Sequence, residues 1–527
     1  MNEIEFRSNP ARAFVHDAIL DTCKSVPSRI AIVDVSEPSP QYSRITYALY
    51  GDLVEAVARG FIRNGVRPSD VIGIYLNNCW EFAVAYHAAT LSGAIPTFLN
   101  PSYREREVRY QLQDCAARIL VTDGSLISTF DLASITSLKT VFCTRHHIPG
   151  TLQFSALLEN HTNSFPEPIA SSEQTIAALP YSSGTTGLAK GVMLSHYNLL
   201  SNVFQFLASG RQLRSLRHDD VALGFLPLYH IYGLNVVLNP TLIKGATVVL
   251  MPRFEIKTAL GMLQQENVTW LPAVPTVINA LADAAAQGDF PINHRIRYTK
   301  SGAAPLAPEL AARYTLHTGI TIVQGYGMTE ASPVTHCGFL EPELYRPDSI
   351  GMPVADTECR LVDDLESNPS EDYGQLVMRG PQIMMGYWNA PEDTAAALRD
   401  GWYWSGDVAT RDKDGFFKIV DRLKEMIKFK GFPISPAEIE SVLMEHPMVK
   451  DCGVTGCPDT NAGEIPCAFV VLKPAATPST ALQSELRTFV RDRLTTYKQP
   501  QQVHFLDAIP RSLSGKILRR DLRTLLT

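Results

Sequence analysis

The sequence predicts an α/β protein with a large N-terminal domain, built of helix-flanked parallel or mixed sheets and ending in a small β-rich subdomain, followed by a small α+β C-terminal domain. Three observations lead to this prediction. Helix-like and strand-like patterns alternate before residue 347, as in parallel sheets covered by helices. Short strands separated by turn residues follow from about 347 to 423. Residues 424–527 return to a compact mixture of helices and strands, and a segment of that length suits a separate small domain.

The alternation begins near residue 46. Leu53, Val57 and Phe61 recur at helical spacing, so they share one face of a predicted helix. The segments after it have the patterns of a strand, an apolar helix, a strand, a polar helix and a strand, at 71–76, 80–91, 95–99, from 104, and at 118–123. This order predicts parallel strands joined by helices.

A glycine-rich stretch, YSSGTTGLAKGVMLSH at 181–196, comes next. Its glycines let backbone N–H groups approach an anion closely, and its hydroxyl groups can add hydrogen bonds. A strand-like run precedes it and we expect a helix to open near Ser195, which is the context for phosphate binding. Because Gly191 follows Lys190, the stretch is not a Walker A motif. Taken alone, it fits a flexible surface loop equally well.

Later segments extend the same architecture. Alternation continues with strands and one helix, the strands at 221–226, 246–251, 268–275 and 320–324 and the helix at 277–286. The β-rich subdomain contains short strand-like segments at 358–364, 374–381 and 414–422. In the C-terminal domain a helix opens at Ser435 with Pro436 in its first turn. Strands at 449–456 and 467–473 and a helix at 482–494 complete that domain.

Composition and charge narrow the function classes. The net charge of -7 gives no electrostatic reason to expect a nucleic-acid partner. The 9 cysteines are odd in number and lack paired CxxC spacing. This pattern argues against a zinc site and a disulfide framework, and it favours a reducing, cytoplasmic location. The longest apolar region, 221–251, is interrupted by Pro227 and Lys244, so we expect buried strands and turns there, and no membrane span. The first residues lack the pattern of a secretory signal.

Four further stretches carry chemically useful side chains, at 225–235, 324–330, 402–432 and 510–520. Tyr326 suits stacking on a base, Glu330 suits Mg²⁺ coordination through one carboxylate, and Asp407 suits the hydroxyl groups of a ribose. Lys516 follows a Ser-Gly turn and can stabilise charge on a phosphate and a carboxylate. Each stretch has an ordinary alternative: His230 as a core histidine, a strand-to-helix turn, a solvated strand, or a charged tail.

Taken together, in this order and spacing, the five stretches resemble the adenylate-forming superfamily of acyl-CoA synthetases, luciferases and nonribosomal peptide adenylation domains. The resemblance covers nearly the whole chain and is strongest to the 4-coumarate:CoA ligase-like branch. The motifs that carry it are HIYGLN, KSGAAPL, QGYGMTEASPV, DRLKEMIKFKGF and AIPRSLSGKILRRDLR.

The resemblance implies a two-step reaction carried out by two domains. An AMP-binding N-terminal domain, 1–423, would bind ATP and a carboxylic acid, and a mobile C-terminal domain, 424–527, would swivel between the half-reactions. The carboxylate first attacks the α-phosphate of MgATP, giving acyl-AMP and pyrophosphate, and the acyl group then passes to coenzyme A. The resemblance therefore implies ATP, Mg²⁺ and coenzyme A as cofactors and a hydrophobic carboxylic acid as substrate.

Matched motif by motif, the resemblance also assigns the nucleotide site. The residues around the β- and γ-phosphates are Ser182, Ser183, Gly184, Thr185, Thr186, Gly187 and Lys190. The residues around the adenine are Ala303, Ala304, Gln324, Gly325 and Tyr326, and those that hold the ribose are Asp407 and Arg422. Thr329 and Glu330 serve the α-phosphate, with Glu330 as the Mg²⁺ ligand.

Catalytic roles follow in the same way. Lys516 would act in adenylation by bridging the carboxylate and the phosphate, and His230 would lie near the reacting carboxylate. Lys424 matches the hinge, and the surface used for thioester formation includes Lys428, Lys430 and Gly431. Pro433 stands where the plant ligases carry glutamine. Because a proline offers no side-chain hydrogen bond and no N–H, the glutamine's contact must be absent or replaced.

The acyl pocket of the branch matches eight positions, Tyr232, Val236, Lys300, Ser301, Gly302, Gly325, Pro333 and Val334. We expect the small residues among them to leave room for a flat, apolar acid. Lys300 matches a residue that donates to the para-hydroxyl of hydroxycinnamates, which favours a phenolic acid, although an ordinary exposed lysine is the alternative. Val236 would narrow or dry the pocket, and medium-chain fatty acids stay open as substrates.

Three other functions were weighed. A stand-alone adenylating enzyme that loads an acyl or peptidyl carrier protein differs from the ligase only in its acceptor. A luciferase-like oxygenase fits less well, because HIYGLN resembles the ligase version of that motif. A catalytically silent nucleotide-binding scaffold is opposed by the joint presence of the seven residues Lys190, His230, Glu330, Asp407, Arg422, Lys428 and Lys516.

Overall fold

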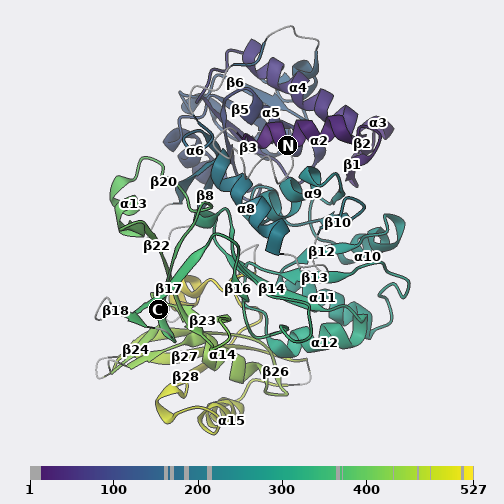
Figure 1. Ribbon diagram of the computed structural model, residues 1–527. Coiled ribbons are helices and arrows are strands. Elements are labelled where there is room, and N and C mark those ends of the chain that lie inside the picture. Colours follow the sequence, from purple (N-terminus) through teal and green to yellow (C-terminus); the bar gives the residue numbers. More distant parts are fainter. Residues whose placement is uncertain are drawn as a thin grey trace.

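Four β-sheets and the helices around them make up the computed structural model (Figure 1). The structure describes residues 13–159, 164–166, 171–182, 189–209, 216–363, 368–370, 372–430, 432–459, 462–474, 476–511 and 515–525. Two large sheets belong to the N-terminal part of the chain, a third follows the change of pattern near residue 347, and the fourth lies in the C-terminal part. The predicted α/β class is therefore confirmed.

The first large sheet has nine strands in the order β16-β15-β14-β13-β12-β10-β11-β1-β2. Its six central strands run parallel, and the strands at both edges are antiparallel. The strands are β1 (Ile30–Asp34), β2 (Arg44–Thr46), β10 (Val221–Gly224), β11 (Thr247–Leu250), β12 (Trp270–Ala273), β13 (Tyr298–Ser301), β14 (Ile322–Gly327), β15 (Val334–Cys337) and β16 (Met352–Pro353). Parallel central strands are buried on both faces, which agrees with the fully buried β12.

The second large sheet has eight strands in the order β20-β9-β8-β4-β3-β5-β6-β7, parallel from β8 to β7. The strands are β3 (Val71–Tyr75), β4 (Ile95–Phe98), β5 (Ile119–Thr122), β6 (Thr140–Cys143), β7 (Leu152–Gln153), β8 (Ile176–Ser182), β9 (Lys190–Ser195) and β20 (Gly386–Tyr387). The helix and strand order predicted between residues 46 and 123 is confirmed.

Helices cover and separate the two sheets. They are α2 (Val15–Ser25), α3 (Pro40–Ser43), α4 (Tyr47–Arg63), α5 (Trp80–Leu91), α6 (Glu105–Asp114), α7 (Gly124–Ile127), η2 (Leu132–Ser134), η3 (Phe154–Leu158), α8 (His196–Ser209), η4 (Gly233–Leu238), α9 (Asn239–Ile243), α10 (Ile256–Gln265), α11 (Pro275–Ala286), α12 (Pro308–Thr318) and η5 (Thr329–Ala331). All residues of helix α5 are buried, so its mostly apolar side chains face protein on every side of the helix. Helix α8 packs on β8 and β9 of one sheet and on β15 of the other.

The third sheet is antiparallel and matches the predicted β-rich segment. Its strands are β17 (Glu358–Asp363), β18 (Asn368–Ser370), β19 (Tyr373–Arg379), β21 (Leu398–Arg399), β22 (Trp402–Arg411) and β23 (Phe417–Arg422). The short helix α13 (Pro391–Ala397) lies between β20 and β21 in the chain.

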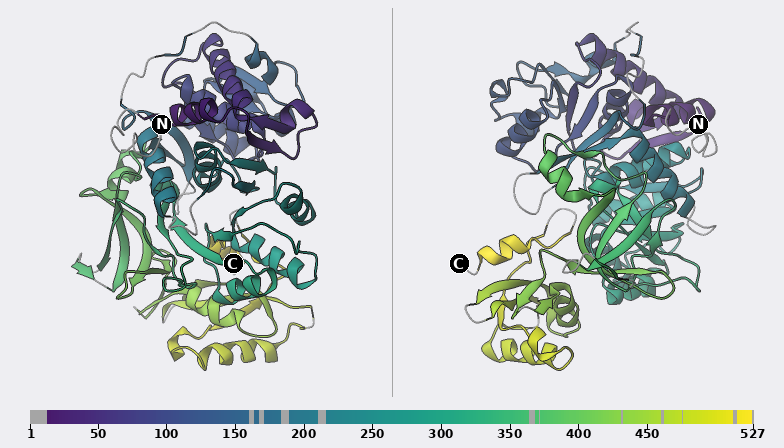
Figure 2. Two further views of the ribbon diagram at one scale, coloured as in Figure 1. Left: turned by 45° about the vertical axis from the view of Figure 1, so that its right-hand side comes forward. Right: turned by 60° about the vertical axis from the view of Figure 1, so that its left-hand side comes forward.

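The C-terminal part forms the fourth sheet and lies at the opposite end of the molecule from the purple N-terminal helices in both views of Figure 2. Its elements are β24 (Ile427–Phe429), β25 (Phe432–Ile434), α14 (Pro436–Met444), β26 (Val449–Asp459), β27 (Gly463–Leu472), α15 (Thr480–Arg491), η6 (Thr496–Lys498), β28 (Gln502–Phe505) and α16 (Arg519–Thr524). Ser435 caps α14 by accepting a hydrogen bond from the N–H of Glu438, and Pro436 occupies the first turn, as predicted.

The hydrophobic cores follow the same division. One cluster runs through both large sheets and into the third, from Ala13 to Phe417. The buried residues of the fourth sheet form clusters of their own, with Ile427 and Leu522 at their limits. The C-terminal part therefore has the separate core that a small domain needs.

Two predicted segments differ from the structure. The glycine-rich loop leads into strand β9, which pairs with β8 and was not predicted, whereas helix α8 begins at His196, next to the predicted start near Ser195. The apolar region 221–251 is not made of strands and turns alone, because the π-helix η4 and the helix α9 lie between β10 and β11. The unpredicted elements β9, η4 and α9 are each too short for hydrophobic periodicity to distinguish a helix from a strand.

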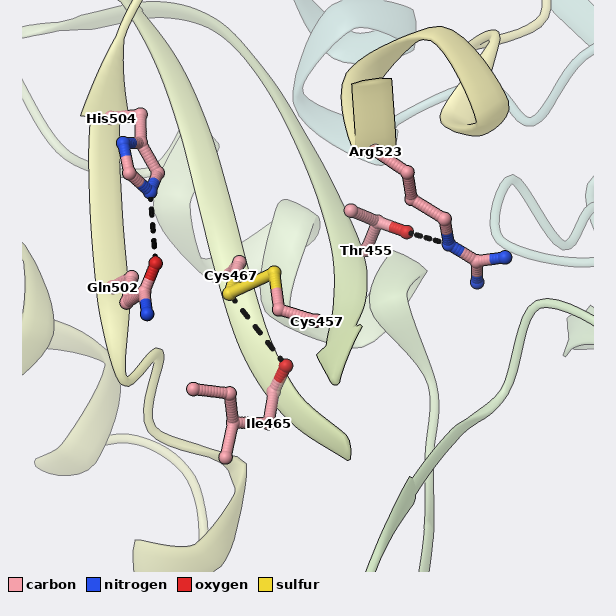
Figure 3. Close-up of a disulfide and its surroundings, with 7 residues drawn as sticks. All are labelled: Thr455, Cys457, Ile465, Cys467, Gln502, His504 and Arg523. Carbon is pink, nitrogen blue, oxygen red and sulfur yellow. Dashed lines mark hydrogen bonds between the residues drawn. A yellow bond between two sulfur atoms is a disulfide. The ribbon is translucent and has the colours of Figure 1, made fainter. Parts of the chain in front are cut away.

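A disulfide joins Cys457 of β26 to Cys467 of β27 (Figure 3). The cysteine pattern argued against a disulfide framework, and this pair was missed because strand register, not sequence spacing, brings the two residues together. Thr455 lies opposite Cys467 in the antiparallel ladder. Cys457 follows Thr455 by two residues, so its side chain lies on the same face of the sheet as those of Thr455 and Cys467, diagonally across from Cys467. The other seven cysteines are free.

No helix within the described ranges is both long enough and apolar enough to cross a membrane. This agrees with the absence of a predicted span in the apolar region 221–251.

Replacing Gly60 by alanine should lower the thermal stability of the protein. Gly60 lies where α4 packs on η3, and an added Cβ would lie 2.6 Å from the carbonyl oxygen of Leu157. Overpacking of this kind costs about 1–3 kcal/mol, more than the ~1 kcal/mol that alanine gains over glycine in a helix. Thermal unfolding followed by circular dichroism measures the change.

Gly261→Ala in α10 is the matched control, because the nearest atom to its added Cβ is 3.9 Å away. This variant should unfold at the same or a higher temperature than the parent. If Gly60→Ala behaved like Gly261→Ala, the packing of α4 on η3 would be wrong.

Candidate active site

The carboxylate of Glu330 is held by side chains from two other segments of the chain. Glu330 lies in η5, directly after Thr329, and is buried. Its Oε1 atom accepts hydrogen bonds from the Ser182 hydroxyl at 3.0 Å and from the Tyr387 hydroxyl at 3.1 Å. Because Ser182 ends β8 and Tyr387 lies in β20, this carboxylate marks the point where the glycine-rich hairpin meets the end of the nine-stranded sheet.

The glycine-rich loop connects two paired strands. Ser182 lies opposite Lys190 in the β8–β9 ladder, so the loop leaves and re-enters the sheet at adjacent positions. Its predicted phosphate-binding residues Ser183, Gly184, Thr185, Thr186 and Gly187 lie outside the described residues. Strand β9 lies between the loop and helix α8, so the loop does not lead directly into a helix as the sequence suggested.

Lys190 is tied to the outer side of the same region. Its ammonium group forms an ion pair with Asp393 of α13 and lies 5.7 Å from the centre of the Tyr387 ring. The cation is therefore close to the loop but already neutralised in part by a carboxylate. A phosphate contact by Lys190 requires it to compete with Asp393.

Asp407 is the second buried carboxylate of the site. It lies opposite Arg422 in the β22–β23 ladder, with 3.4 Å between Oδ1 and the Arg422 Nε atom. The hydroxyl of Tyr326 donates to Oδ2. Burial raises the pKa of Asp407, and Arg422 followed by Tyr326 opposes that shift. The two residues predicted for the ribose are thus in contact with each other, and one oxygen of Asp407 is engaged by a residue predicted for the adenine.

The other predicted adenine residues lie at the ends of β13 and β14. Gln324 pairs with Ser301 between these strands. Its side-chain oxygen accepts from the N–H of Leu306 at 3.2 Å, and its side-chain nitrogen donates to the carbonyl of Pro347 at 2.6 Å. The amide therefore joins two loops, and it positions the segment that contains Ala303 and Ala304.

Lys516 reaches the N-terminal carboxylates from the C-terminal part of the chain. The negative charges of Asp407 and Glu330 act to raise the pKa of Lys516, but burial and the charge of Arg422 outweigh them, so its pKa is lowered. The Lys516 side chain is nevertheless exposed to solvent, so the charge is only partly desolvated. The preceding Gly515, with a φ of +84°, lies against Thr276 of α11.

His230 is close enough to Lys516 to be affected by its charge. Its Nδ1 atom accepts a hydrogen bond from the N–H of Tyr232 at 3.2 Å, which places the ring proton on Nε2. Burial, with the charge of Lys516 as the second cause, lowers the pKa of His230 to about 4. The imidazole is therefore neutral at physiological pH.

The lysine predicted for the acyl pocket is buried, so the alternative of an ordinary exposed lysine is wrong. Lys300 is 4% exposed. Its ammonium group donates to the Cys337 sulfur at 2.9 Å and lies 4.3 Å from the centre of the Phe206 ring. The hydroxyl of Tyr232 donates to the carbonyl of Lys300 at 3.1 Å, so two predicted pocket residues are directly joined.

The glycines of the acyl pocket have a different function from the one expected. A Cβ on Gly302 would lie 3.0 Å from the Tyr232 ring, and a Cβ on Gly325 would lie 2.7 Å from Cε of Lys300. The space that these glycines leave is therefore filled by Tyr232 and Lys300, not left for the acid. The remaining predicted lining residues are all buried, and they are Val236, Ser301, Pro333 and Val334.

The predicted residues of the C-terminal face are not gathered with the others. Lys424, Lys428 and Lys430 are exposed. The N–H of Lys428 donates to Glu464, and Lys428 pairs with Pro433 between β24 and β25. In the described part of the chain, no hydrogen bond or ion pair joins Lys428 or Lys430 to Glu330 or Asp407. Gly431 lies outside the described residues.

Two residues of this region were missed from the sequence. Tyr387 binds Glu330 and faces Lys190, and Cys337 binds Lys300. Tyr387 follows a glycine in a turn-rich stretch, which gave only a weak signal of a ligand-facing position. Cys337 gave none, because a buried cysteine is common in any core.

Comparison with known proteins decides the family. The AMP-binding enzyme family matches residues 20–388, and the AMP-binding enzyme C-terminal domain matches residues 438–516. The chain belongs to the AMP-binding enzyme family. Glu330 lies in the first matched range and Lys516 is the last residue of the second, whereas Asp407 lies between the two ranges.

Relatives of this AMP-binding enzyme match it over almost its whole length. The 4-coumarate–CoA ligase 2 of Nicotiana tabacum is 39% identical over 89% of this chain and 86% of its own. The 4-coumarate–CoA ligase 1 of Arabidopsis thaliana is 34% identical over 99% of this chain and 95% of its own.

Solved structures of the same fold include two nucleotide complexes. Anthranilate CoA ligase AuaEII with anthranoyl-AMP is 26% identical over 98% of both chains, with a TM-score of 0.87. ATP-bound MatB from Rhodopseudomonas palustris is 27% identical over 98% of this chain and 99% of its own, also with a TM-score of 0.87.

Glu330 fits the Mg²⁺ that the family implies. No group of three or more His, Cys, Asp or Glu side chains that could hold a metal occurs among the described residues. A single oriented carboxylate is nevertheless what Mg²⁺ needs when substrate phosphates and water supply its remaining ligands. Ser182 and Tyr387 provide that orientation by binding one carboxylate oxygen.

Replacing His230 by alanine should reduce acid-dependent pyrophosphate release by the same factor at every pH from about 6 to 8, because a histidine with a pKa well below its ordinary ~6.5 does not titrate there. A loss of about 100-fold is expected for removal of one positioned polar group. Initial rates across the pH range, with the exposed His147→Ala as a control of unchanged rate, check this. A ratio that changes with a midpoint near the ordinary histidine pKa would contradict the neutral imidazole.

Proposed function

We propose that this AMP-binding enzyme converts an aryl-alkenoic acid of the 4-coumarate type to its CoA thioester. The reaction class rests on the family: the chain is an ATP-dependent acid–CoA ligase that forms an acyl-AMP and releases pyrophosphate. ATP, coenzyme A and a carboxylic acid are its substrates, with Mg²⁺ as the metal. The single observation that carries the substrate class is the buried ammonium of Lys300.

The convergence of Glu330, Asp407 and Lys516 supports the adenylation step. Glu330 and Thr329 would meet the α-phosphate, and Ser182 to Lys190 would meet the β- and γ-phosphates. A bound Mg²⁺ would neutralise phosphate charge beside Glu330. Lys516 would bridge the incoming carboxylate and the α-phosphate, where its charge stabilises the charge that develops. Positioning and neutralisation suffice for this step, so no covalent intermediate with the enzyme is required.

The same three residues belong to two parts of the chain, which supports a two-domain mechanism. We assign the domains to 1–423, with a β-rich subdomain at about 347–423, and to 424–527, with Lys424 as the hinge. The exposed lysines Lys428 and Lys430 would face the site after the C-terminal domain turns. The C-terminal domain can then serve acyl-AMP formation with Lys516 and thioester formation with the face that carries Lys428 and Lys430.

The position of Lys300 supports a phenolic acid. Its buried ammonium lies beside the Cys337 thiol and the face of the Phe206 ring, among the residues predicted to line the acyl pocket. A para-hydroxyl at the end of the pocket would offer an oxygen acceptor to this cation. A medium-chain fatty acid offers no such oxygen and is the less favoured alternative.

The acyl acceptor and the location are separate proposals. Coenzyme A is favoured because the curated relatives are CoA ligases over almost their whole length, and a separate carrier protein is the alternative acceptor. A cytoplasmic location is supported by the seven free cysteines, with the Cys457–Cys467 disulfide as the exception.

An acid panel tests the proposed function. Pyrophosphate release is measured with 4-coumarate, cinnamate, benzoate and octanoate, and the thioester is identified by mass spectrometry. We expect the highest kcat/KM with the hydroxycinnamate. A preference for octanoate, or product formation only with a carrier protein, would contradict the proposal.

Two lysine variants should separate the half-reactions. Lys516→Ala should slow acyl-AMP formation by roughly 100- to 1000-fold, as for loss of one charge-stabilising donor. It should leave thioester formation from added acyl-AMP within about twofold of the parent, a difference below ~0.5 kcal/mol. Lys428→Ala should show the opposite pattern. Equal effects of both variants on both steps would rule out the division of roles.

Lys300→Met should lower the preference for a para-hydroxylated acid, because methionine keeps the apolar stem but lacks the donor. The ratio of kcat/KM for 4-coumarate to that for cinnamate should fall about tenfold, as for loss of one polar contact. Lys139→Met, at an exposed lysine, is the control and should leave the ratio unchanged. An unchanged ratio in Lys300→Met would remove Lys300 from acid recognition.

A further inference from the structure

The backbone segment 332–334 is held by two buried asparagine side chains. Asn202 of α8 accepts a hydrogen bond from the N–H of Val334 at 2.9 Å and donates one to its carbonyl at 2.7 Å. Asn235 of η4 donates to the carbonyl of Ser332 at 2.6 Å. Both asparagines are fully buried. Two helices thus fix one short segment through its main chain.

The segment needs such support. Ser332 has a φ of +68°, a left-handed conformation that residues other than glycine rarely adopt. It is also fully buried, so an unpaired carbonyl there would be strongly disfavoured. The hydrogen bond from Asn235 satisfies that carbonyl, and the paired bonds from Asn202 fix both polar groups of Val334. Small errors in this segment would otherwise move the start of β15.

The orientation of the Asn235 amide is unambiguous. Its nitrogen donates to two carbonyl oxygens, that of Ser332 and that of Leu199 at 3.1 Å. Its oxygen must therefore face the side-chain nitrogen of Asn239, 2.8 Å away. Because a carbonyl can only accept, no flipped amide satisfies the same partners.

This orientation is passed on to helices α5 and α4. The oxygen of Asn239 lies 3.1 Å from Nε2 of His87, and the hydroxyl of Tyr50 lies 2.6 Å from Nδ1. Burial lowers the pKa of His87 to about 4, so the ring is neutral. One arrangement then satisfies every group: Tyr50 donates to Nδ1, and the Nε2 proton of His87 is donated to Asn239. A one-directional chain of hydrogen bonds ends on the carbonyl of Ser332.

Asn202 is oriented independently. Its nitrogen also donates to the side-chain oxygen of Gln205 at 3.1 Å, and the Gln205 nitrogen donates to the carbonyl of Ala355 at 2.7 Å. This second network runs towards β16 and away from α5. The segment is therefore supported from two sides that share no residue.

The supported segment joins the two halves of the substrate site. It begins two residues after Glu330 and contains the predicted acyl-pocket residues Pro333 and Val334. Asn235 itself lies between the pocket residues Tyr232 and Val236 on η4. A shift of 332–334 would therefore change the position of the pocket wall relative to both the bound acid and the Glu330 carboxylate.

We propose that Asn202 and Asn235 are positioning residues that set the width of the acyl pocket and so its discrimination between acids. They act through the backbone of 332–334 and do not touch the acid. The inference rests on the proposed function, because it assigns 332–334 to the acid-binding wall.

The kinetic test uses Asn202→Leu and Asn235→Leu in the full-length protein. Each should raise the KM for 4-coumarate about tenfold, as for loss of a buried polar contact, while the KM for ATP changes less than about twofold. The ratio of kcat/KM for 4-coumarate to that for a ring-methoxylated analogue should fall, because a loosened wall admits the wider ring.

Gln111→Leu is the matched control. Gln111 is a buried amide that donates to Thr97 and to the carbonyl of Phe98 in the eight-stranded sheet. Its loss removes a similar number of hydrogen bonds at a site away from 332–334. It should lower thermal stability and leave acid discrimination unchanged. An equal loss of discrimination in this variant would mean that general destabilisation, not positioning, is responsible, and would overturn the inference.

Hydrogen–deuterium exchange gives a readout that needs no activity. The Val334 amide should exchange slowly in the parent protein and about tenfold faster in Asn202→Leu, because the side chain that accepts its hydrogen bond is gone. Asn202→Asp keeps an oxygen towards that amide but loses the donor to the Val334 carbonyl. It should keep the protection and still raise the KM for the acid, and it also serves if the leucine variant does not fold.

The outcomes distinguish the two proposals. If none of the acids on the panel causes the parent protein to release pyrophosphate, the proposed function has failed. The exchange rate of the Val334 amide then decides by itself whether Asn202 holds the segment 332–334. If the parent is active but Asn202→Leu and Asn235→Leu keep both the exchange protection and the acid discrimination, the inference is refuted and the proposed function stands.

Discussion

The attraction between one ammonium group and two buried carboxylates is the interaction on which the site depends. Lys516 comes from the C-terminal part of the chain, whereas Glu330 lies in η5 and Asp407 in β22 of the N-terminal part. Burial opposes a charge at this position, and Arg422 adds repulsion, so the lysine is stable there only while the carboxylates or a substrate anion face it. The same lysine helps to keep His230 neutral. Because attraction and desolvation nearly cancel for this lysine, and because it belongs to a separate part of the chain, it is suited to reversible binding at the site.

The local structure around this interaction explains how each group keeps its place. Ser182 and Tyr387 orient Glu330, and Arg422 with Tyr326 orients Asp407. The acid side of the site is supported in another way, by asparagine amides that hold main-chain atoms. The nucleotide side thus depends on charged hydrogen bonds, and the acid side depends on the shape of a backbone segment.

Much of the fold followed from the sequence, because long alternating patterns such as 46–123 specify both element type and order. The nucleotide residues could be predicted because five motifs in fixed order reinforce one another. The rest depends on tertiary contacts that no local pattern carries. Strand β9 forms only because it can pair with β8, and the Cys457–Cys467 pair follows strand register. The sequence placed Lys300 in the acyl pocket with an exposed lysine as the alternative, and only the structure placed it against Cys337 and Phe206.

The most direct test of this account is acid-dependent exchange of labelled pyrophosphate into ATP in the absence of coenzyme A. If Lys516, Glu330 and Asp407 form an adenylation site that works before the C-terminal part turns, exchange requires only the acid, ATP and Mg²⁺. We predict exchange at a rate that does not depend on added coenzyme A. Exchange that begins only when coenzyme A is present would contradict an acyl-AMP formed in a separate first step.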